Sequence, residues 1–337
     1  MNYSGIDLHS NNSVVLVSDE ADRILCQRRV PNELGAVLGT LEPYRADLAG
    51  VVVESTYNWY WLVDGLQAAG YRVHLANTSA IKQYEGLKHS GDESDAAHLA
   101  HLLRLGILPT GYICPPQARA LRDLARKRLQ LGRSRTAHIL AVENIVARQT
   151  GARIKSRDVK QLTTDELQKL GQSEDVTLAM AANVAVIQTL NTQIDKLEAR
   201  LRERVRPRAE FKLLTSAPGI GEILATTIML ETGTVERFAA VGNFASYARC
   251  VDSQRMSNGK KKGEGNVKNG NRYLAWAFVE AANFARRYCP QAKRFYERKK
   301  ARTNNIVATK ALAHKLARAC YHMLKDQAPF DVKRCFA

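Results

Sequence analysis

The stretch "VVVEST", residues 51–56, joins a run of apolar β-forming residues to one carboxylate, Glu54. The valines are typical of a buried strand. Burying a lone ionised carboxylate is strongly unfavourable unless the group is paired or binds a metal ion. We therefore expect either that Glu54 lies where the strand reaches solvent, or that other groups gather around it.

Strand-like and helical patterns alternate over the first hundred residues. Three strands in a meander, separated by turns rich in Asn, Ser and Asp, are followed by helix, strand, helix, strand and helix. The predicted strands are 3–7, 13–18, 23–30, one that ends at Glu54, and 71–77, and the closing helix is 92–106. This order is typical of a ribonuclease-H-like α/β fold, in which the first and fourth strands are neighbours in a mixed sheet.

The rest of the chain has a helical pattern. Between about Pro115 and Arg208 a heptad seam is formed by Ile187, Leu190, Ile194, Leu197 and Leu201. Such a seam is typical of a coiled coil or a long helical hairpin, and both packing within one chain and self-association would satisfy it. Beyond Pro207 the pattern is mostly helical, interrupted by a polar, Gly-rich segment, 257–271, that we expect to be a loop.

These patterns predict three domains. They are a ribonuclease-H-like (RuvC-like) domain over 1–114, a helical and coiled-coil segment over 115–208, and a mostly helical, all-α domain over 209–337.

Charge indicates the kind of partner. The chain carries 50 Lys and Arg against 33 Asp and Glu, a formal net charge of +17. An excess of this size favours a polyanion, and nucleic acid above all. No stretch approaches the roughly 20 apolar residues of a membrane span, and the first residues lack a signal-peptide pattern. We expect a cytoplasmic protein with no membrane partner, whose six scattered cysteines are free thiols rather than zinc ligands.

Four acids fall at strand and helix ends in the first domain. Asp7 ends the first strand and Glu54 the fourth, while Asp92 and Asp95 stand three apart at the start of the closing helix and share one face. The predicted strand order would bring all four together. Four carboxylates need cations to share a small volume, and oxygen ligands suit Mg²⁺ or Mn²⁺. The alternatives are that Asp92 caps its helix and that Asp7 is a turn residue.

Two glycine-containing segments in the last domain suggest nucleic-acid contacts. "PGIG" (218–221) lies between two apolar helices and resembles a helix-hairpin-helix element, whose backbone N–H groups could hold a phosphate. A plain helix–helix corner would look the same. The segment from Ser257 carries the Lys260–Lys262 triplet, and a serine in that setting is most often a turn residue.

Taken together, "GIDLH", "VVVEST", "GDESDAAHLA", "SAPGIGEILA", "FASYARCV" and the serine before a basic "NGN" segment resemble one family over residues 3 to 330. It is the family of DEDD transposases of bacterial insertion sequences that includes the Piv pilin-gene invertases, some members of which are guided by a bridge RNA. The resemblance implies a site-specific recombinase that moves an insertion sequence. Asp7, Glu54, Asp92 and Asp95 match the tetrad that holds Mg²⁺ or Mn²⁺, and Ser257 matches the nucleophile. Ser253 and Ser246 are alternative alignments for it.

The resemblance also implies partners. These are donor and target double-stranded DNA, a guide (bridge) RNA, and further copies of the chain in a dimer or a tetrameric synapse. The predicted nucleic-acid contacts are Gly219, Gly221, Lys260, Lys261, Lys262, Lys268 and Arg272. A metal-dependent nuclease or junction resolvase that uses water instead of serine is one alternative. A non-catalytic DNA- or RNA-binding protein, whose acids merely cap helices, is the other.

Overall fold

The computed structural model describes residues 1–81, 92–251, 254–264 and 269–336; for residues 92, 93, 254–256, 261 and 264 it describes the backbone alone. The chain divides into two compact units, Met1–Pro116 and Gln117–Ala337. The finer division of the second unit at residue 208 stays a prediction.

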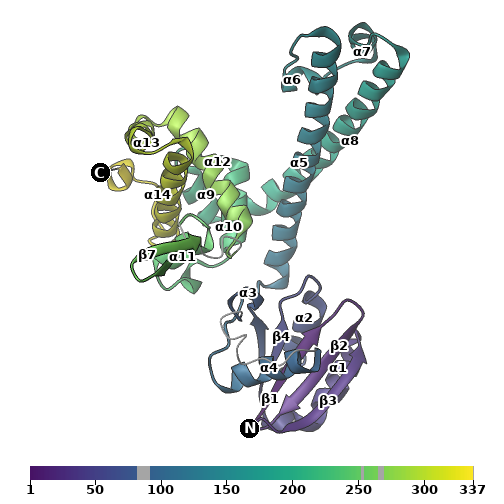
Figure 1. The fold of residues 1–337 in the computed structure, drawn as a ribbon, viewed down its shortest axis with the longest axis vertical. Helices are drawn as coiled ribbons and strands as arrows, with labels where there is room; N and C mark the ends of the chain where they lie inside the picture. Colours follow the sequence, from purple (N-terminus) through teal and green to yellow (C-terminus); the bar gives the residue numbers. More distant parts are fainter. Residues whose placement is uncertain (82–91, 252–253, 265–268, 337) are drawn as a thin grey trace. The chain divides into compact units, whose positions relative to one another are not determined.

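The first unit is built on a five-stranded mixed sheet (Figure 1). Its strands are β1 (Asn2–Leu8), β2 (Asn12–Ser18), β3 (Ile24–Pro31), β4 (Leu48–Glu54) and β5 (Val73–Ala76), in the order β3-β2-β1-β4-β5. β1, β2 and β3 form an antiparallel meander, whereas β4 runs parallel to both β1 and β5. The predicted strand sequence is confirmed, as is the prediction that the first and fourth strands are neighbours.

Helices cover both faces of this sheet because strand residues alternate between them. Ile6, Leu8 and Val53 point to a core that also contains residues of α1 (Leu34–Leu41) and α2 (Tyr60–Ala68). On the opposite face α4 (Asp92–Arg104) packs against β1, β2 and β4. The connecting elements are a 3₁₀ turn, η1 (Glu42–Asp47), and the short helix α3 (Thr78–Ile81).

Gly5 determines how closely α4 approaches the sheet. A Cβ atom at residue 5 would lie 2.0 Å from the carbonyl oxygen of Ala96 and 3.0 Å from the backbone nitrogen of Ala100. Any side chain larger than hydrogen would therefore push the helix away from β1. The glycine of "SGIDLH" thus seats the first turns of α4 directly on the strand that carries Asp7.

The second unit begins with a long helical hairpin. Its arms, α5 (Pro116–Thr150) and α8 (Glu174–Val205), are joined through α6 (Ser156–Val159) and α7 (Thr164–Leu170), as Figure 1 shows. Polar pairs between the arms run in antiparallel order: Arg128 with Glu198, Arg135 with Asn191, and His138 with Asn183.

The heptad seam packs inside this hairpin. Ile187 and Leu201 are buried in cores shared with α5, whereas Leu190 and Leu197 are half-buried. The interpretation as a helical hairpin is confirmed, because the buried seam residues have partners in the same chain. Self-association through the seam stays a prediction.

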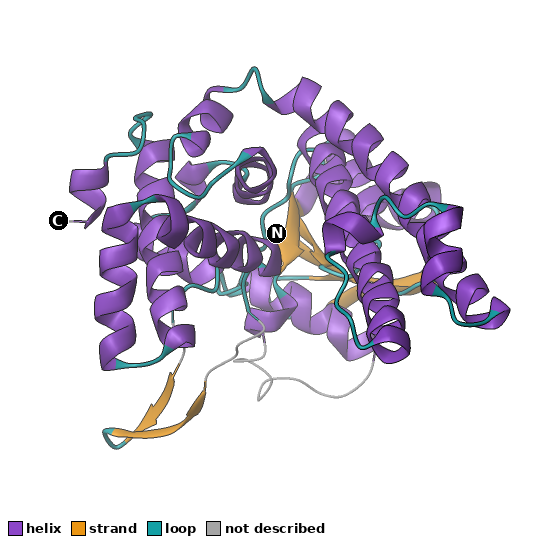
Figure 2. Cartoon of the chain, turned by 90° about the horizontal axis from the view of Figure 1, so that it is seen from above, coloured by secondary structure: helices purple, strands orange, loops and turns teal. Residues whose placement is uncertain are grey.

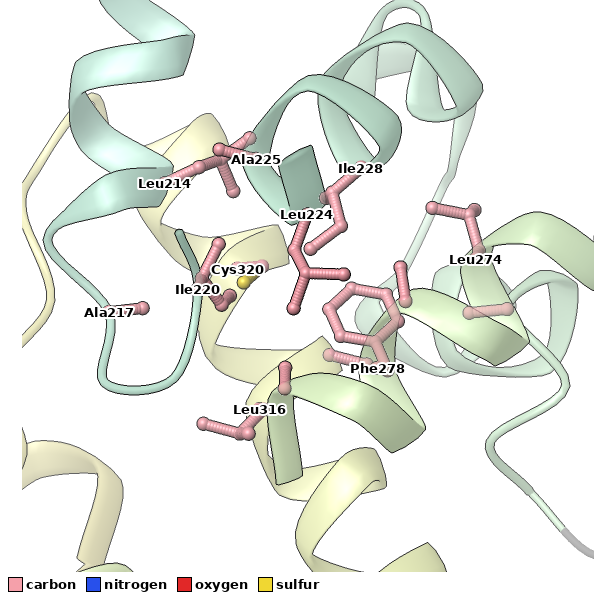
Figure 3. Packing of buried hydrophobic residues seen from close by; sticks show 14 of the residues in the cluster. Leu214, Ala217, Ile220, Leu224, Ala225, Ile228, Leu274, Phe278, Leu316 and Cys320 are labelled. Atoms are coloured by element: carbon pink, nitrogen blue, oxygen red, sulfur yellow. The ribbon is translucent and has the colours of Figure 1, made fainter. Parts of the chain in front are cut away.

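The remaining helices of the second unit surround one large core. They are α9 (Ala209–Thr215), α10 (Glu222–Thr232), the 3₁₀ turn η3 (Val235–Arg237), α11 (Val241–Tyr247), α12 (Arg272–Tyr288), α13 (Pro290–Arg302), α14 (Asn305–Lys325) and α15 (Val332–Phe336). Leu224, Phe278 and Leu316, from α10, α12 and α14, meet in this core (Figure 3).

The segment expected to be a loop contains a β-hairpin instead. β6 (Gln254–Ser257) pairs with β7 (Lys260–Glu264) in antiparallel order, and Figure 2 shows this pair extending from the helices around it. Asn258 and Gly259 form the turn, with φ of 48° and 69°. An Asn-Gly pair with both φ values positive is the favoured two-residue hairpin connection. The loop prediction was wrong over these residues. It relied on the many glycines of the segment and overlooked that the Asn-Gly pair is itself typical of a hairpin turn.

The predictions about membrane spans and cysteines can be compared with the structure. Within the part of the chain that the structure covers, no helix has the length and apolar character needed to cross a membrane. Three of the six cysteines are buried and three are half-buried, and none of the six is in a disulfide.

Candidate active site

Asp7 and Glu54 lie next to each other in the register of the sheet. In the parallel β1–β4 pair, Gly5 lies opposite Val52 and Ile6 opposite Val53, so Asp7 and Glu54 occupy the following position. Because side chains alternate along a strand, Asp7 shares the face of Gly5 and Glu54 shares the face of Val52. That face is the one covered by α4. Asp7 is only 3% exposed, whereas Glu54 is half-buried.

The first turn of α4 supplies the other two acids. Asp95 precedes Ala96, whose carbonyl oxygen faces Gly5, and its side chain is half-buried. Asp92 is the first residue of the helix and lies three residues earlier, on the same face. Its side chain is outside the described part of the chain. The backbone thus directs the start of α4 toward the ends of β1 and β4.

The donor chemistry of these acids suits a hard cation. Carboxylate oxygens are the ligands that Mg²⁺ and Mn²⁺ prefer, and a carboxylate as buried as Asp7 needs a compensating positive charge. Among the side chains that the structure describes, which do not include Asp92, no three His, Cys, Asp or Glu come together closely enough to hold a metal ion. The assignment of the four acids as metal ligands stays a prediction.

His9 is a neighbour of Asp7 that the sequence interpretation missed. Its Nε2 lies 3.2 Å from Asp7 Oδ2. The backbone carbonyl of His9 accepts hydrogen bonds from the side-chain amides of Asn32 and Asn58, each at 3.0 Å. Asn58 follows β4, so these bonds tie the ends of β1 and β4 together. His9 could have been predicted as a neighbour of Asp7, because residues two apart in a strand lie on the same face. Nothing in the local sequence indicates that Asn32 and Asn58 bind the His9 carbonyl.

Ser257 is the last residue of β6 and is exposed beside the hairpin turn. It pairs in register with Lys260. The β-hairpin therefore presents the hydroxyl group to solvent, where another molecule can reach it. Of the alternative serines, Ser246 is exposed on α11, and Ser253 lies outside the described residues.

A buried polar network holds the residue where the chain returns from this hairpin to α12. Asn271 caps α12 by accepting hydrogen bonds from the backbone N–H groups of Tyr273 and Leu274, at 2.8 and 3.1 Å. Its side-chain amide donates to Glu231 Oε2 at 2.7 Å. Arg126, on α5, donates twice to the same carboxylate, at 2.6 and 2.8 Å.

This network links three helices that are far apart in sequence. Burial by itself would lower the pKa of the Arg126 guanidinium, but the hydrogen bonds and the charge of Glu231 raise that pKa well above its ordinary value. Arg126 therefore stays charged and the pair persists. We call Arg126, Glu231 and Asn271 the root network.

The predicted helix-hairpin-helix turn has a packing role at its first glycine. Gly219 has φ of +82°, and a Cβ there would lie 2.3 Å from the carbonyl oxygen of Ala281 on α12. At Gly221 an added Cβ would meet nothing within 4 Å. Glu222, in the first turn of α10, forms ion pairs with Arg202 and Arg206. Phosphate binding by either glycine stays a prediction.

The other predicted nucleic-acid contacts are partly described. Lys260, Lys262 and Arg272 are exposed, and Arg272 opens α12. Lys261 is described only as backbone within β7, and Lys268 lies outside the described residues.

Comparison with known proteins identifies the family. Residues 4–149 match the family model of DEDD transposases of the IS110 type, described as "Transposase". Residues 211–297 match a second model, described as "Transposase IS116/IS110/IS902 family". The two matches concern one family, follow each other along the chain and together cover more than half of it. The chain belongs to the IS110 family of DEDD transposases.

Relatives of this IS110-family transposase agree with the assignment. A "Probable family 20 transposase" of Pseudomonas aeruginosa is 24% identical over 339 residues, covering 96% of each chain. The "Insertion element IS900 uncharacterized 42 kDa protein" of Mycobacterium paratuberculosis is 29% identical over 43% of this chain and 37% of its own length. The "Insertion element IS110 uncharacterized 43.6 kDa protein" of Streptomyces coelicolor is 26% identical over 46% of this chain and 38% of its own. As a transposase, the protein is an enzyme that cleaves and joins DNA.

Proposed function

We propose that this transposase cuts and rejoins DNA through a covalent bond between Ser257 and a DNA phosphate. The observation that carries the proposal is the position of Ser257, exposed at the end of β6 beside a tight turn. A hydroxyl group presented in this way can approach a phosphodiester without a deep pocket around it. The fold of the first unit is, in this proposal, that of a RuvC-like catalytic domain.

The covalent step exchanges one ester bond for another. Ser257 Oγ attacks the phosphorus and gives its proton to a base, while the bond from phosphorus to one sugar oxygen breaks and that oxygen takes up a proton to leave as a hydroxyl group. A sugar hydroxyl of the recipient strand later attacks the phosphoserine and releases the serine. Because the phosphate stays esterified throughout, the strand is rejoined without an external energy source.

The four acids are assigned to the same reaction. Asp7, Glu54, Asp92 and Asp95 would hold Mg²⁺ or Mn²⁺ through carboxylate oxygens. When bound, such an ion neutralises charge that develops on phosphate oxygens. His9, at 3.2 Å from Asp7, and the asparagines that bind its carbonyl would keep the Asp7 carboxylate in position.

The proposal includes a guide RNA and self-association. The net charge of +17 suits a protein that holds RNA and DNA together. A bridge RNA would supply sequence recognition by base pairing, and a dimer or tetramer of the chain would bring donor and target DNA together. Purification from cells that carry the whole insertion sequence, followed by RNA extraction, tests the first point. Light scattering with and without that RNA tests the second.

The decisive test of the serine is a trapped adduct. Wild-type protein and Ser257→Ala are incubated with end-labelled donor-junction DNA and Mg²⁺, denatured, and separated by electrophoresis. We expect label to migrate with wild type and not with the variant, while DNA affinity stays within about twofold because the hydroxyl is small and exposed. Ser246→Ala is the matched control and should form the adduct normally.

Two other results would change the assignment. An adduct that survives in Ser257→Ala but is lost in Ser246→Ala or Ser253→Ala would move the nucleophile to that residue. Cleavage by both wild type and Ser257→Ala, with no adduct in either, would favour a nuclease that uses water.

A further inference from the structure

A basic hollow lies between α5 and the start of α12 in the second unit. Its volume is about 560 Å³, and it is lined by Asp123, Arg126, Lys127, Leu129, Gln130, Arg133, Ser134, Arg272 and Tyr273. Four of these residues are cationic and one is acidic. The hollow has room for a phosphate group with its sugar, and the charges at its wall are mainly positive.

The cations of this hollow differ in what they already bind. Arg126 is bound to Glu231 and also lies 3.9 Å from Asp123. Lys127 and Arg133 are exposed on α5, and Lys127 Nζ donates to an uncharged group, Gln130 Oε1, at 3.2 Å. Lys127 and Arg133 therefore bring two exposed positive charges to the hollow.

Tyr273, at the start of α12, positions two arginine side chains that line the hollow. The guanidinium carbons of Arg126 and Arg272 lie 4.6 and 5.0 Å from the centre of its ring. Nη2 of Arg272 also donates to the Tyr273 hydroxyl group at 3.1 Å. Cation–π contacts hold a guanidinium in place without using up its charge. Arg272 thus remains available to an anion although its side chain is positioned.

The root network joins the hollow to the start of α12, the helix that follows the Ser257 hairpin in the chain. Arg126 lines the hollow and binds Glu231, which binds Asn271, the residue immediately before Arg272. An anion bound between Lys127, Arg133 and Arg272 would therefore lie at the place where the chain enters α12 from the hairpin.

We infer that this hollow binds the phosphodiester backbone of a nucleic-acid strand, through Lys127, Arg133 and Arg272. The inference rests on the proposed function, since it gives the strand a fixed path near the hairpin that carries the nucleophile. Backbone recognition is favoured over base recognition because the lining is cationic, and charge carries no sequence information. The phosphodiester can come from DNA or from RNA, and the test distinguishes them.

The test compares two double variants with equal loss of charge. Lys127→Ala with Arg133→Ala removes the two exposed cations of the hollow. Arg148→Ala with Lys196→Ala removes two exposed cations from the same helical hairpin, away from the hollow. Each protein is titrated by fluorescence anisotropy at several salt concentrations with a mixed-sequence DNA duplex and with single-stranded RNA of equal length. Melting temperatures of both variants should match wild type, because all four side chains are exposed.

The slope of log affinity against log salt is the deciding quantity. Losing two phosphate contacts should make it shallower by about 1.8 on duplex DNA, or by about 1.4 on single-stranded RNA. A change with DNA alone assigns the hollow to DNA, and a change with RNA alone assigns it to RNA. The control variant should keep the wild-type slope on both probes. Equal slopes for the hollow variant and wild type on both probes would overturn the inference.

The outcome is independent of the covalent step. If wild type forms the serine adduct while the hollow variant keeps the wild-type slope, the inference fails and the proposed function stands. If the slope changes but no adduct forms in any protein, the hollow binds nucleic acid and the serine mechanism fails.

Discussion

The acids of the first unit and the serine of the second are held in opposite ways. Asp7 is 3% exposed, in a sheet covered by α4, and its position follows from strand register and from the close contact at Gly5. Ser257 is exposed at the end of a two-stranded hairpin, and the described contacts that fix the hairpin's return to the chain lie at Asn271. This contrast suits the proposed roles, in which acids keep a fixed spacing in a packed core and a nucleophile reaches a large substrate from a projecting element.

This difference predicts how substitutions should act. Changes at the acids should remove activity while leaving the fold intact, because isosteric replacement keeps the packing. Substitutions near the β6–β7 hairpin should change activity indirectly, by altering the helices next to it in the chain.

The largest effect is expected at the acids. Asp7→Asn, Glu54→Gln, Asp92→Asn and Asp95→Asn should each reduce strand cleavage by at least about a hundredfold, because a cation site that loses one charged ligand loses affinity and position. Calorimetric titration with Mn²⁺ should show weaker binding in each variant, with unchanged melting temperatures. Glu33→Gln, an exposed acid of the same unit, is the control and should behave as wild type. Full activity in two of the four variants would refute the tetrad.

The two glycines of the "PGIG" turn separate packing from ligand binding. Gly219→Ala should destabilise the protein by about 2–4 kcal/mol, because the new Cβ would lie 2.3 Å from Ala281 O at a positive φ. Gly221→Ala should cost less, about 0.5–1 kcal/mol, because its surroundings are open and the main penalty is that alanine is a poorer N-cap than glycine for α10. Urea denaturation measures both. A loss of DNA affinity in the stable Gly221→Ala protein would support phosphate binding at this turn, and unchanged affinity would count against it.

A smaller effect is expected at the root network. Asn271→Ala should cost about 1–2 kcal/mol, because α12 loses its cap and Glu231 loses a donor. It should also slow formation of the Ser257 adduct. Asn304→Ala is matched to it, since Asn304 caps α14 through the Val307 N–H at 2.9 Å. This control should lose similar stability with no change in adduct rate. Equal slowing in both variants would mean that Asn271 acts only on stability.

The sheet could be predicted because its information is local. Apolar runs separated by polar turns were enough to predict where the strands lie. The predicted strand order then placed Asp7 and Glu54 on neighbouring strands, although the sequence gives no distance between them. The register adds only that both acids face α4. The long helix α8 was predicted for the same reason, since the 3–4 spacing of Ile187 to Leu201 repeats along it, but the spacing left open whether its partner lies in the same chain.

The contacts around the site could not be predicted because they join distant residues. Arg126 and Glu231 are 105 positions apart, and Gly219 is restricted by Ala281 on another helix. Nothing in the neighbouring sequence specifies either contact. The β6–β7 hairpin is a different case, because its Asn258–Gly259 turn was visible in the sequence and was given too little weight against the lysines and glycines around it.

The two-stranded form of this hairpin also governs how fast its backbone exchanges hydrogen with solvent. Within the described chain β6 and β7 pair only with each other, so each strand has one outer edge without a strand partner. Isolated two-stranded ribbons are marginally stable and open locally without global unfolding. Their amides should exchange orders of magnitude faster than those of β1, which has a strand on each side. Slower exchange at β6 and β7 on adding DNA would then report directly that the substrate has reached the hairpin that carries Ser257.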